Sequence, residues 1–133
     1  MVWPTMVGGN YALEAAGVTS HNVLAPSLIA VSGEDVRLAA VASGPRDDLV
    51  VVVELAPRTS TGFDATAQQI LATRAHVTKG PALGFAPLEQ VAAAGMNSDV
   101  SVAIDPVTDC AVVAWQAVLA GVPVVQWAVC TSG

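Results

Sequence analysis

The side chains that could carry out chemistry in this chain are few and widely separated. The two histidines, His21 and His76, have no second histidine, cysteine or carboxylate at the spacing of a zinc site. Serine, histidine and aspartate all occur, but no G-x-S-x-G sequence presents a serine nucleophile. We therefore predict no catalytic residue, no bound metal and no cofactor, and a small hydrolase is the least favoured function.

Three aspartates, Asp99, Asp105 and Asp109, flank one predicted turn. Hard cations such as Ca²⁺ prefer several carboxylate oxygens around one point, but the spacing differs from that of an EF-hand loop. Because Pro106 is a common turn former, an ordinary turn is the favoured interpretation and cation binding is the alternative.

Trp115 and Trp127 are the residues best suited to contact a ligand. Both fall at odd positions of adjacent predicted strands, so they can share one face of a sheet. Exposed tryptophans there would stack on a sugar, whereas buried ones would form part of the core, which is the commoner outcome.

Cys110 and Cys130 fall in the two strands of one predicted hairpin. If the hairpin turns about Ala120, the two cysteines face each other within reach of a disulfide. If the hairpin instead keeps the register of an earlier one, Cys110 faces Val129 and the cysteines project to opposite faces. We favour the opposed pair, with reduced thiols because the sequence carries no export signal.

Two similar segments carry these residues. Residues 35–55 read DVRLAAVASGPRDDLVVVVEL, residues 109–129 read DCAVVAWQAVLAGVPVVQWAV, and the two align without a gap. Each is an apolar run, a turn-prone break and a Val-rich run, and such a unit must stack on a neighbour to bury its faces. We predict a single β-rich domain, 1–133, with an internal duplication of about 11–58 and 84–133.

The first unit predicts an antiparallel hairpin of strands 36–42 and 49–55. In its register Arg37 faces Glu54, and opposite charges directly across two strands are mildly stabilising. The valines at 50–53 favour a strand, and their continuous run indicates burial on both faces.

One middle segment, 64–76, has apolar spacings that allow a short helix, and intrinsic propensity slightly favours helix there. A second candidate helix, 87–95, opens with Pro87 at a plausible N1 position and closes at Gly95. A shared phrase in 61–70 and 83–91, Gly-Phe followed by a Gln before a branched residue, argues for strands instead. The predicted fold is mostly β, with antiparallel meanders that form blade-like units or a two-sheet sandwich or barrel, and at most these two short helices.

The composition predicts a covered surface. Of the 133 residues 53% are apolar and 12% are charged, and the net charge is −6. This charge density is low for a solitary domain, and obligate interfaces are depleted of charge in the same way. We therefore predict an exposed apolar patch that a partner covers, in a homo-oligomer or a larger protein assembly.

Other partners and locations are less compatible with the sequence. The five cationic residues are scattered among eleven acids, which argues against nucleic acid and anionic membranes as partners. No run of eighteen apolar residues occurs, and the N-terminus lacks the basic and apolar regions of a secretory signal. We expect a cytoplasmic protein or one assembled into a particle.

Residues 99–129, DVSVAIDPVTDCAVVAWQAVLAGVPVVQWAV, resemble a blade of the bacterial β-propellers built from BNR-like or sialidase-type repeats. Residues 84–95 resemble the run that precedes such a blade, and 25–55 match the pattern without its Asp-Pro turn and its Trp. The resemblance implies a binding or scaffold surface. It carries over no catalytic residue, because the sialidase arginine cluster, acid and nucleophile have no counterpart here.

Two classes of function follow. The leading hypothesis is a non-enzymatic structural module, a subunit of a larger homo-oligomer such as a virion or shell component. The alternative is a propeller-like module that binds carbohydrate or peptide. The spacing of the two copies exceeds the roughly 40–50 residues of one blade. Because two or three blades cannot close a ring of about four to eight, a closed ring would need several chains.

Overall fold

The computed structural model describes residues 1–18, 25–76 and 83–130, and all regular secondary structure within them is β-strand. The strands form three antiparallel sheets. The N-terminal sheet has the order β1-β2-β3, with β1 (Val2–Val7), β2 (Asn10–Ala15) and β3 (Ser27–Ile29). The prediction of a mostly β, antiparallel fold is confirmed.

The central and C-terminal sheets contain the rest of the strands. The central sheet has the order β4-β5-β7-β8, made of β4 (Glu34–Ser43), β5 (Asp48–Thr59), β7 (Gln68–His76) and β8 (Gly84–Phe85). The short β6 (Gly62–Phe63) pairs with β5, and β9 (Glu89–Gly95) pairs with β7. The C-terminal sheet is the meander β10 (Asn97–Ile104), β11 (Ala111–Leu119) and β12 (Val122–Cys130).

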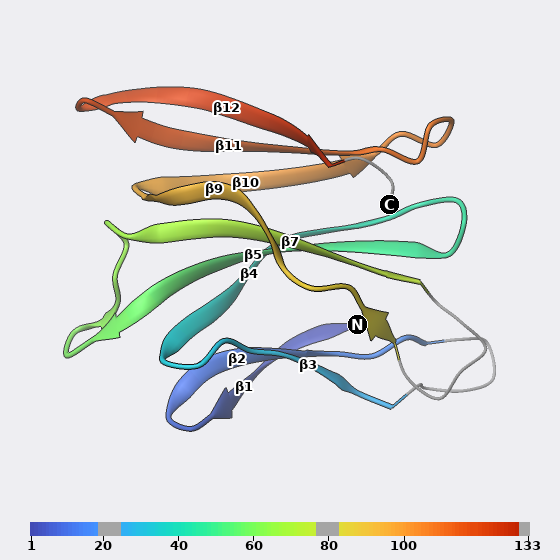
Figure 1. Cartoon of the computed structure of the whole chain (residues 1–133), viewed down its shortest axis with the longest axis horizontal. Coiled ribbons are helices and arrows are strands. Elements are labelled where there is room, and N and C mark those ends of the chain that lie inside the picture. The colour runs from blue at the N-terminus through green and yellow to red at the C-terminus, as the bar shows by residue number, and fades with distance from the viewer. Residues whose placement is uncertain (19–24, 77–82, 131–133) are drawn as a thin grey trace.

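The three sheets stack as layers, with the central sheet in the middle (Figure 1). One core cluster joins its Val50 and Val52 to Val113 and Trp115 of β11. A second cluster joins its Val51 and Val53, on the other face, to the N-terminal sheet. All four valines are buried, as the continuous Val run predicted, because both faces of β5 are covered.

The two segments for which helices were considered, 64–76 and 87–95, contain β7 and β9 instead. The slight helix preference for the first segment is wrong. Side chains on β7 alternate in burial from Gln68 to Ala72, with Ile70 fully buried, and β7 forms ladders with both β5 and β9. Pairing on two edges and burial of one face outweigh an intrinsic propensity of a few tenths of a kcal/mol per residue.

The hairpin of β4 and β5 has the predicted pairing at its open end, where Arg37 lies opposite Glu54. The predicted register continues to Leu38 opposite Val53. A bulge between Leu38 and Ala40 then shifts the partners by one residue. Bulges of this kind bend a strand and increase its twist, and a strictly alternating sequence pattern does not locate them.

We expect Glu54→Gln to raise the free energy of unfolding at neutral pH. Burial raises the pKa of Glu54 above its ordinary value of 4.5, against the lowering effect of Arg37 and with a smaller contribution from Asp99. The folded state therefore binds this proton more readily than the unfolded chain, so stability falls as the pH rises through the raised pKa. Urea titrations from pH 3 to pH 8 should show the advantage of the variant disappearing below about pH 4.5. A variant that is less stable than the wild type at pH 7 would contradict this.

The chain crosses from the central sheet to the C-terminal sheet between β9 and β10. Asn97, the first residue of β10, is buried, and its side-chain amide donates hydrogen bonds to the Gln68 carbonyl at 2.7 Å and the Ala93 carbonyl at 2.9 Å. The Met96 carbonyl accepts a hydrogen bond from the Val118 amide at 3.1 Å. These contacts fix how the C-terminal meander lies on the central sheet. The described part of the chain contains no helix that could cross a membrane.

Candidate functional site

A two-residue turn sets the geometry of the C-terminal hairpin. Leu119 pairs with Val122, and the turn residues Ala120 and Gly121 have positive φ angles of 49° and 78°. Two positive φ values define a type I′ turn, whose twist matches that of the two flanking strands. Glycine adopts this backbone without strain, whereas Ala120 does so against its usual preference.

This turn places the two tryptophans on opposite faces of the sheet. Trp127 pairs with Ala114, and Trp115 pairs with Gln126. An odd position thus faces an even one, so the expectation that Trp115 and Trp127 share a face is wrong. Trp115 points into the core and is 6% exposed, whereas Trp127 points outward and is 69% exposed.

The same turn excludes both registers considered for the cysteines. Cys130 lies opposite Ala111, and Val129 lies opposite Val112, so neither faces Cys110. A turn centred on Ala120 would have one residue in the loop between the strands, whereas the type I′ turn has two, Ala120 and Gly121. Cys110 precedes β11, is half-buried and carries a free thiol.

The outward side of this hairpin is apolar. Val112, Val125, Trp127 and Val129 are all exposed there, and we call this set the outer C-terminal face. Leu119 and Val122 add exposed apolar surface at the tip. No Asp, Glu, Lys, Arg or His follows Asp109 in the sequence, so the net charge of −6 is carried entirely by residues 1–109. An exposed apolar set without charge is typical of an interaction surface.

β12 also provides a free sheet edge. Among the described residues it pairs with β11 alone, so the backbone groups on its other side have no strand partner. Proteins usually protect such an edge with charged side chains, proline or a bulge. The sequence of β12, VPVVQWAVC, has only Pro123 for this purpose.

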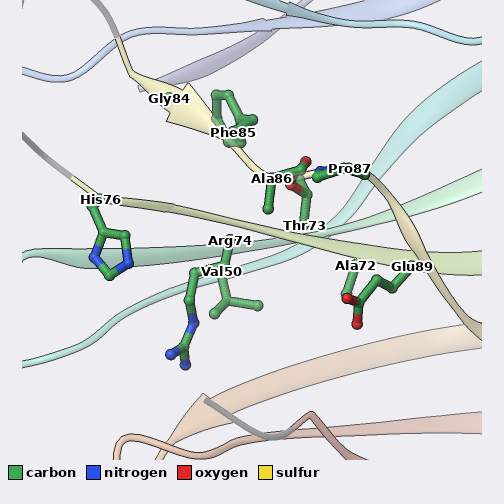
Figure 2. Close-up of a pocket in the computed structure, with 10 residues that line it drawn as sticks. All are labelled: Val50, Ala72, Thr73, Arg74, His76, Gly84, Phe85, Ala86, Pro87 and Glu89. Carbon is green, nitrogen blue, oxygen red and sulfur yellow. Dashed lines mark hydrogen bonds between the residues drawn. The ribbon is translucent and has the colours of Figure 1, made fainter. Parts of the chain in front are cut away.

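A cavity of about 620 Å³ opens on another part of the molecule, along β7 and β8. Arg74 and His76 lie on one stretch of β7, and Arg74 extends away from the side on which Phe85 lies (Figure 2). The lining of this cavity combines apolar and titratable side chains: Val50, Ala72, Thr73, Arg74, His76, Gly84, Phe85, Ala86, Pro87 and Glu89.

Arg74 is the central charged group of this region. Its guanidinium lies 3.3 Å from the Asp109 carboxylate, donates to the Asp109 carbonyl at 2.7 Å and lies 3.9 Å from the Asp48 carboxylate. Nδ1 of His76 contacts the other oxygen of the same Asp48 carboxylate. Asp48 and Asp109 are both buried, so Arg74 compensates two charges that water does not reach.

This ion-pair cluster links layers rather than presenting a free cation to a ligand. Arg74 and Asp48 belong to the central sheet, whereas Asp109 lies in the loop between β10 and β11. The loop approaches closely, since a Cβ atom on Gly44 would lie 3.2 Å from the Asp109 carboxylate. Sequence reasoning missed the cluster because it depends on the pairing of β5 with β7, which places Asp48 opposite His76.

The three aspartates singled out from the sequence have separate roles. Asp109 binds Arg74, whereas the Thr108 hydroxyl and the Val107 amide lower the pKa of the Asp105 carboxyl within its own turn. Asp99 accepts a hydrogen bond from its neighbour Ser98. No group of three metal-ligating side chains occurs in the residues that the structure describes. His21 lies outside those residues.

The N-terminal sheet is held by a third buried aspartate, Asp35. One carboxylate oxygen of Asp35 accepts a hydrogen bond from the Tyr11 amide at 2.7 Å and lies 3.4 Å from the Arg58 guanidinium. Arg58 also donates to the Gly9 carbonyl at 2.8 Å. Arg58 is 39% exposed and Arg74 is 18% exposed. Water therefore screens the Arg58–Asp35 ion pair more strongly than the ion pairs of Arg74.

No protein-family model, curated protein or solved structure matches this chain.

Proposed function

We propose that this protein is a non-enzymatic structural module that associates with further copies of itself through its C-terminal hairpin. The observation that carries the proposal is the coincidence of the outer C-terminal face with the charge-free part of the sequence. Val125 and Trp127 are exposed on this hairpin, and no charged side chain follows Asp109. Burying such a surface is favourable at roughly 25 cal/mol for each Å² of apolar area.

Electrostatics favour the same surface. Two copies that each carry a net charge of −6 repel one another, most strongly at low ionic strength. Contact between copies is then least costly where neither presents charge. The C-terminal hairpin meets this condition, because all eleven acids lie between residues 1 and 109.

The arrangement of the layers supports an assembly role over a catalytic one. The central sheet is covered on both faces, whereas β11 and β12 cover the central sheet with one face only. The guanidinium of Arg74 is already paired with the Asp48 and Asp109 carboxylates. The proposed role is therefore that of a subunit in a larger homo-oligomer, such as a shell or virion component.

Sedimentation equilibrium of the native chain tests this proposal. At micromolar concentration we expect a mass at least twice the 13.4 kDa of one chain. The association should strengthen between 20 mM and 500 mM salt, because salt screens the repulsion between the acidic copies. A mass of 13.4 kDa at every concentration and salt would contradict the proposal.

Carbohydrate binding is the second candidate function, and the exposure of Trp127 favours it. An indole ring on an open sheet face can stack on a sugar ring. Titration of the chain with neutral oligosaccharides, followed by tryptophan fluorescence, tests this function. A saturable change that Trp127→Ala abolishes would support sugar binding, and no change with any oligosaccharide would exclude it for the sugars used.

A further inference from the structure

We infer that β12 pairs with β12 of a second copy, antiparallel across a two-fold axis, so that two C-terminal sheets join into one. This inference rests on the proposed function and names the contact through which the copies associate. The occupant of the β12 edge is thus an identical strand.

The type I′ turn fixes which backbone groups are free. Leu119 and Val122 flank the turn and form its first hydrogen-bonded pair. Hydrogen-bonded and non-hydrogen-bonded pairs alternate along an antiparallel ladder. Consequently Val125, Trp127 and Val129, which pair with Gln116, Ala114 and Val112, direct their N–H and C=O groups away from β11. An extended strand is the structure that can pair with all of these groups at once.

Pro123 belongs to the same alternating set and has no N–H to offer. It therefore limits which registers a second strand can adopt. With Trp127 opposite Trp127 of the second copy, Val125 lies opposite Val129 of that copy, and none of these three residues meets the proline. A register with Val125 opposite Trp127 also forms about six hydrogen bonds, in four pairs. It places Pro123 opposite Val129 in two of those pairs and so leaves the carbonyl of each Val129 without a donor. In the register centred on Trp127 each of the three pairs keeps both of its hydrogen bonds, about six in total, and no carbonyl in the paired stretch faces the proline.

The side chains match in this register. Directly opposed residues project from the same face of a sheet, so the two Trp127 rings meet on the joined outer C-terminal faces. Val125 of one copy contacts Val129 of the other on the same face. Aromatic pairs and pairs of β-branched residues are the favourable cross-strand combinations. The Trp127 pair lies on the two-fold axis and the Val125–Val129 contact occurs twice, as an isologous interface requires.

The absence of charge makes an identical strand acceptable as the partner. β12 contains no charged residue, so antiparallel pairing with itself opposes no like charges. The nearest acids in sequence, Asp105 and Asp109, belong to the loop that links β10 to β11. Neither aspartate is on β12, because this loop connects the other two strands of the C-terminal sheet.

Val125→Pro tests the edge pairing, with Val112→Lys as the matched control. The Val125 N–H points away from β11, so proline should leave the hairpin folded while it removes a donor from two of the three intermolecular pairs. We expect the dissociation constant from sedimentation equilibrium to rise at least tenfold. Val112 belongs to the outer C-terminal face but not to the edge, and Val112→Lys should change the constant less than twofold.

Trp127→Lys provides a second test should Val125→Pro fail to fold. Trp127 is exposed, and lysine there places two like charges opposite each other on the two-fold axis. We expect at least a tenfold rise in the dissociation constant, again against less than twofold for Val112→Lys. Far-ultraviolet circular dichroism shows whether each variant keeps its sheets.

Each other outcome overturns a different statement. Equal losses for Trp127→Lys and Val112→Lys, with Val125→Pro folded and unaffected, would show that the outer faces stack on each other, and the edge pairing would be wrong. An oligomer unchanged by all three variants would move the interface away from the C-terminal hairpin. A wild-type chain that never associates would overturn the proposed function itself.

Discussion

Trp115→Ala should lower the free energy of unfolding by about 3–5 kcal/mol, the range for removing a large buried aromatic side chain. Trp115 is 6% exposed and belongs to the cluster that joins β11 to the central sheet. Its removal leaves a cavity between two layers, and the contacts of Ile70 and Val113 around it cannot all be restored. Urea unfolding followed by circular dichroism measures the loss.

Trp127→Ala is the control for this prediction, because it deletes the same side chain from the exposed face of the same hairpin. At concentrations below self-association it should change the free energy of unfolding by no more than about 0.5 kcal/mol. Trp115→Phe should lower the free energy of unfolding by an amount between those of Trp115→Ala and Trp127→Ala. It keeps an aromatic ring and removes an indole N–H that has no partner. Equal losses for Trp115→Ala and Trp127→Ala would contradict the register of β11 and β12.

Arg74→Met should also cost about 3–5 kcal/mol, the range for breaking a buried ion pair by removing one partner. Methionine preserves most of the aliphatic stem, so the loss isolates the guanidinium. Without it the buried carboxylates of Asp48 and Asp109 lose their shared cation, and the loop before β11 loses its link to β7. Thermal and urea unfolding of the variant measure the effect.

Two further variants control this measurement. Arg58→Met removes a cation from Asp35, but Arg58 is more exposed, so we expect a loss of about 1 kcal/mol. Asp109→Asn added to Arg74→Met should recover part of the loss, because it removes one uncompensated charge. Asparagine tolerates the positive φ of 61° at this position. Additive losses in this double-mutant cycle would show that the two side chains are not coupled.

The sequence predicts the features of this fold that depend on local composition and alternation. The run of valines at 50–53 indicated a strand buried on both faces, and β5 is the centre of the stack. The break at 43–48 and the pairing of Arg37 with Glu54 located the hairpin of β4 and β5. These features follow from β-branched side chains and from a charge pair, and both are visible within about twenty residues of sequence.

The features that the sequence did not predict depend on one-residue differences or on distant contacts. Periodicity does not distinguish a turn centred on Ala120 from the type I′ turn, and that choice decides whether Trp115 and Trp127 share a face of the sheet. The strand at 68–76 is stabilised by its neighbours β5 and β9 rather than by its own propensity. The Arg74 cluster combines residues from three segments, so no local pattern could identify it.

Amide hydrogen exchange along β12 tests the central claim, association through the C-terminal hairpin, most directly. The amides of Val125, Trp127 and Val129 point away from β11, whereas those of the residues between them bond to it. We predict that these three amides exchange quickly in dilute protein and become protected as the concentration passes the association midpoint, together with the rise in sedimenting mass. Fast exchange of all three at every concentration, in a protein that remains at 13.4 kDa, would contradict the account.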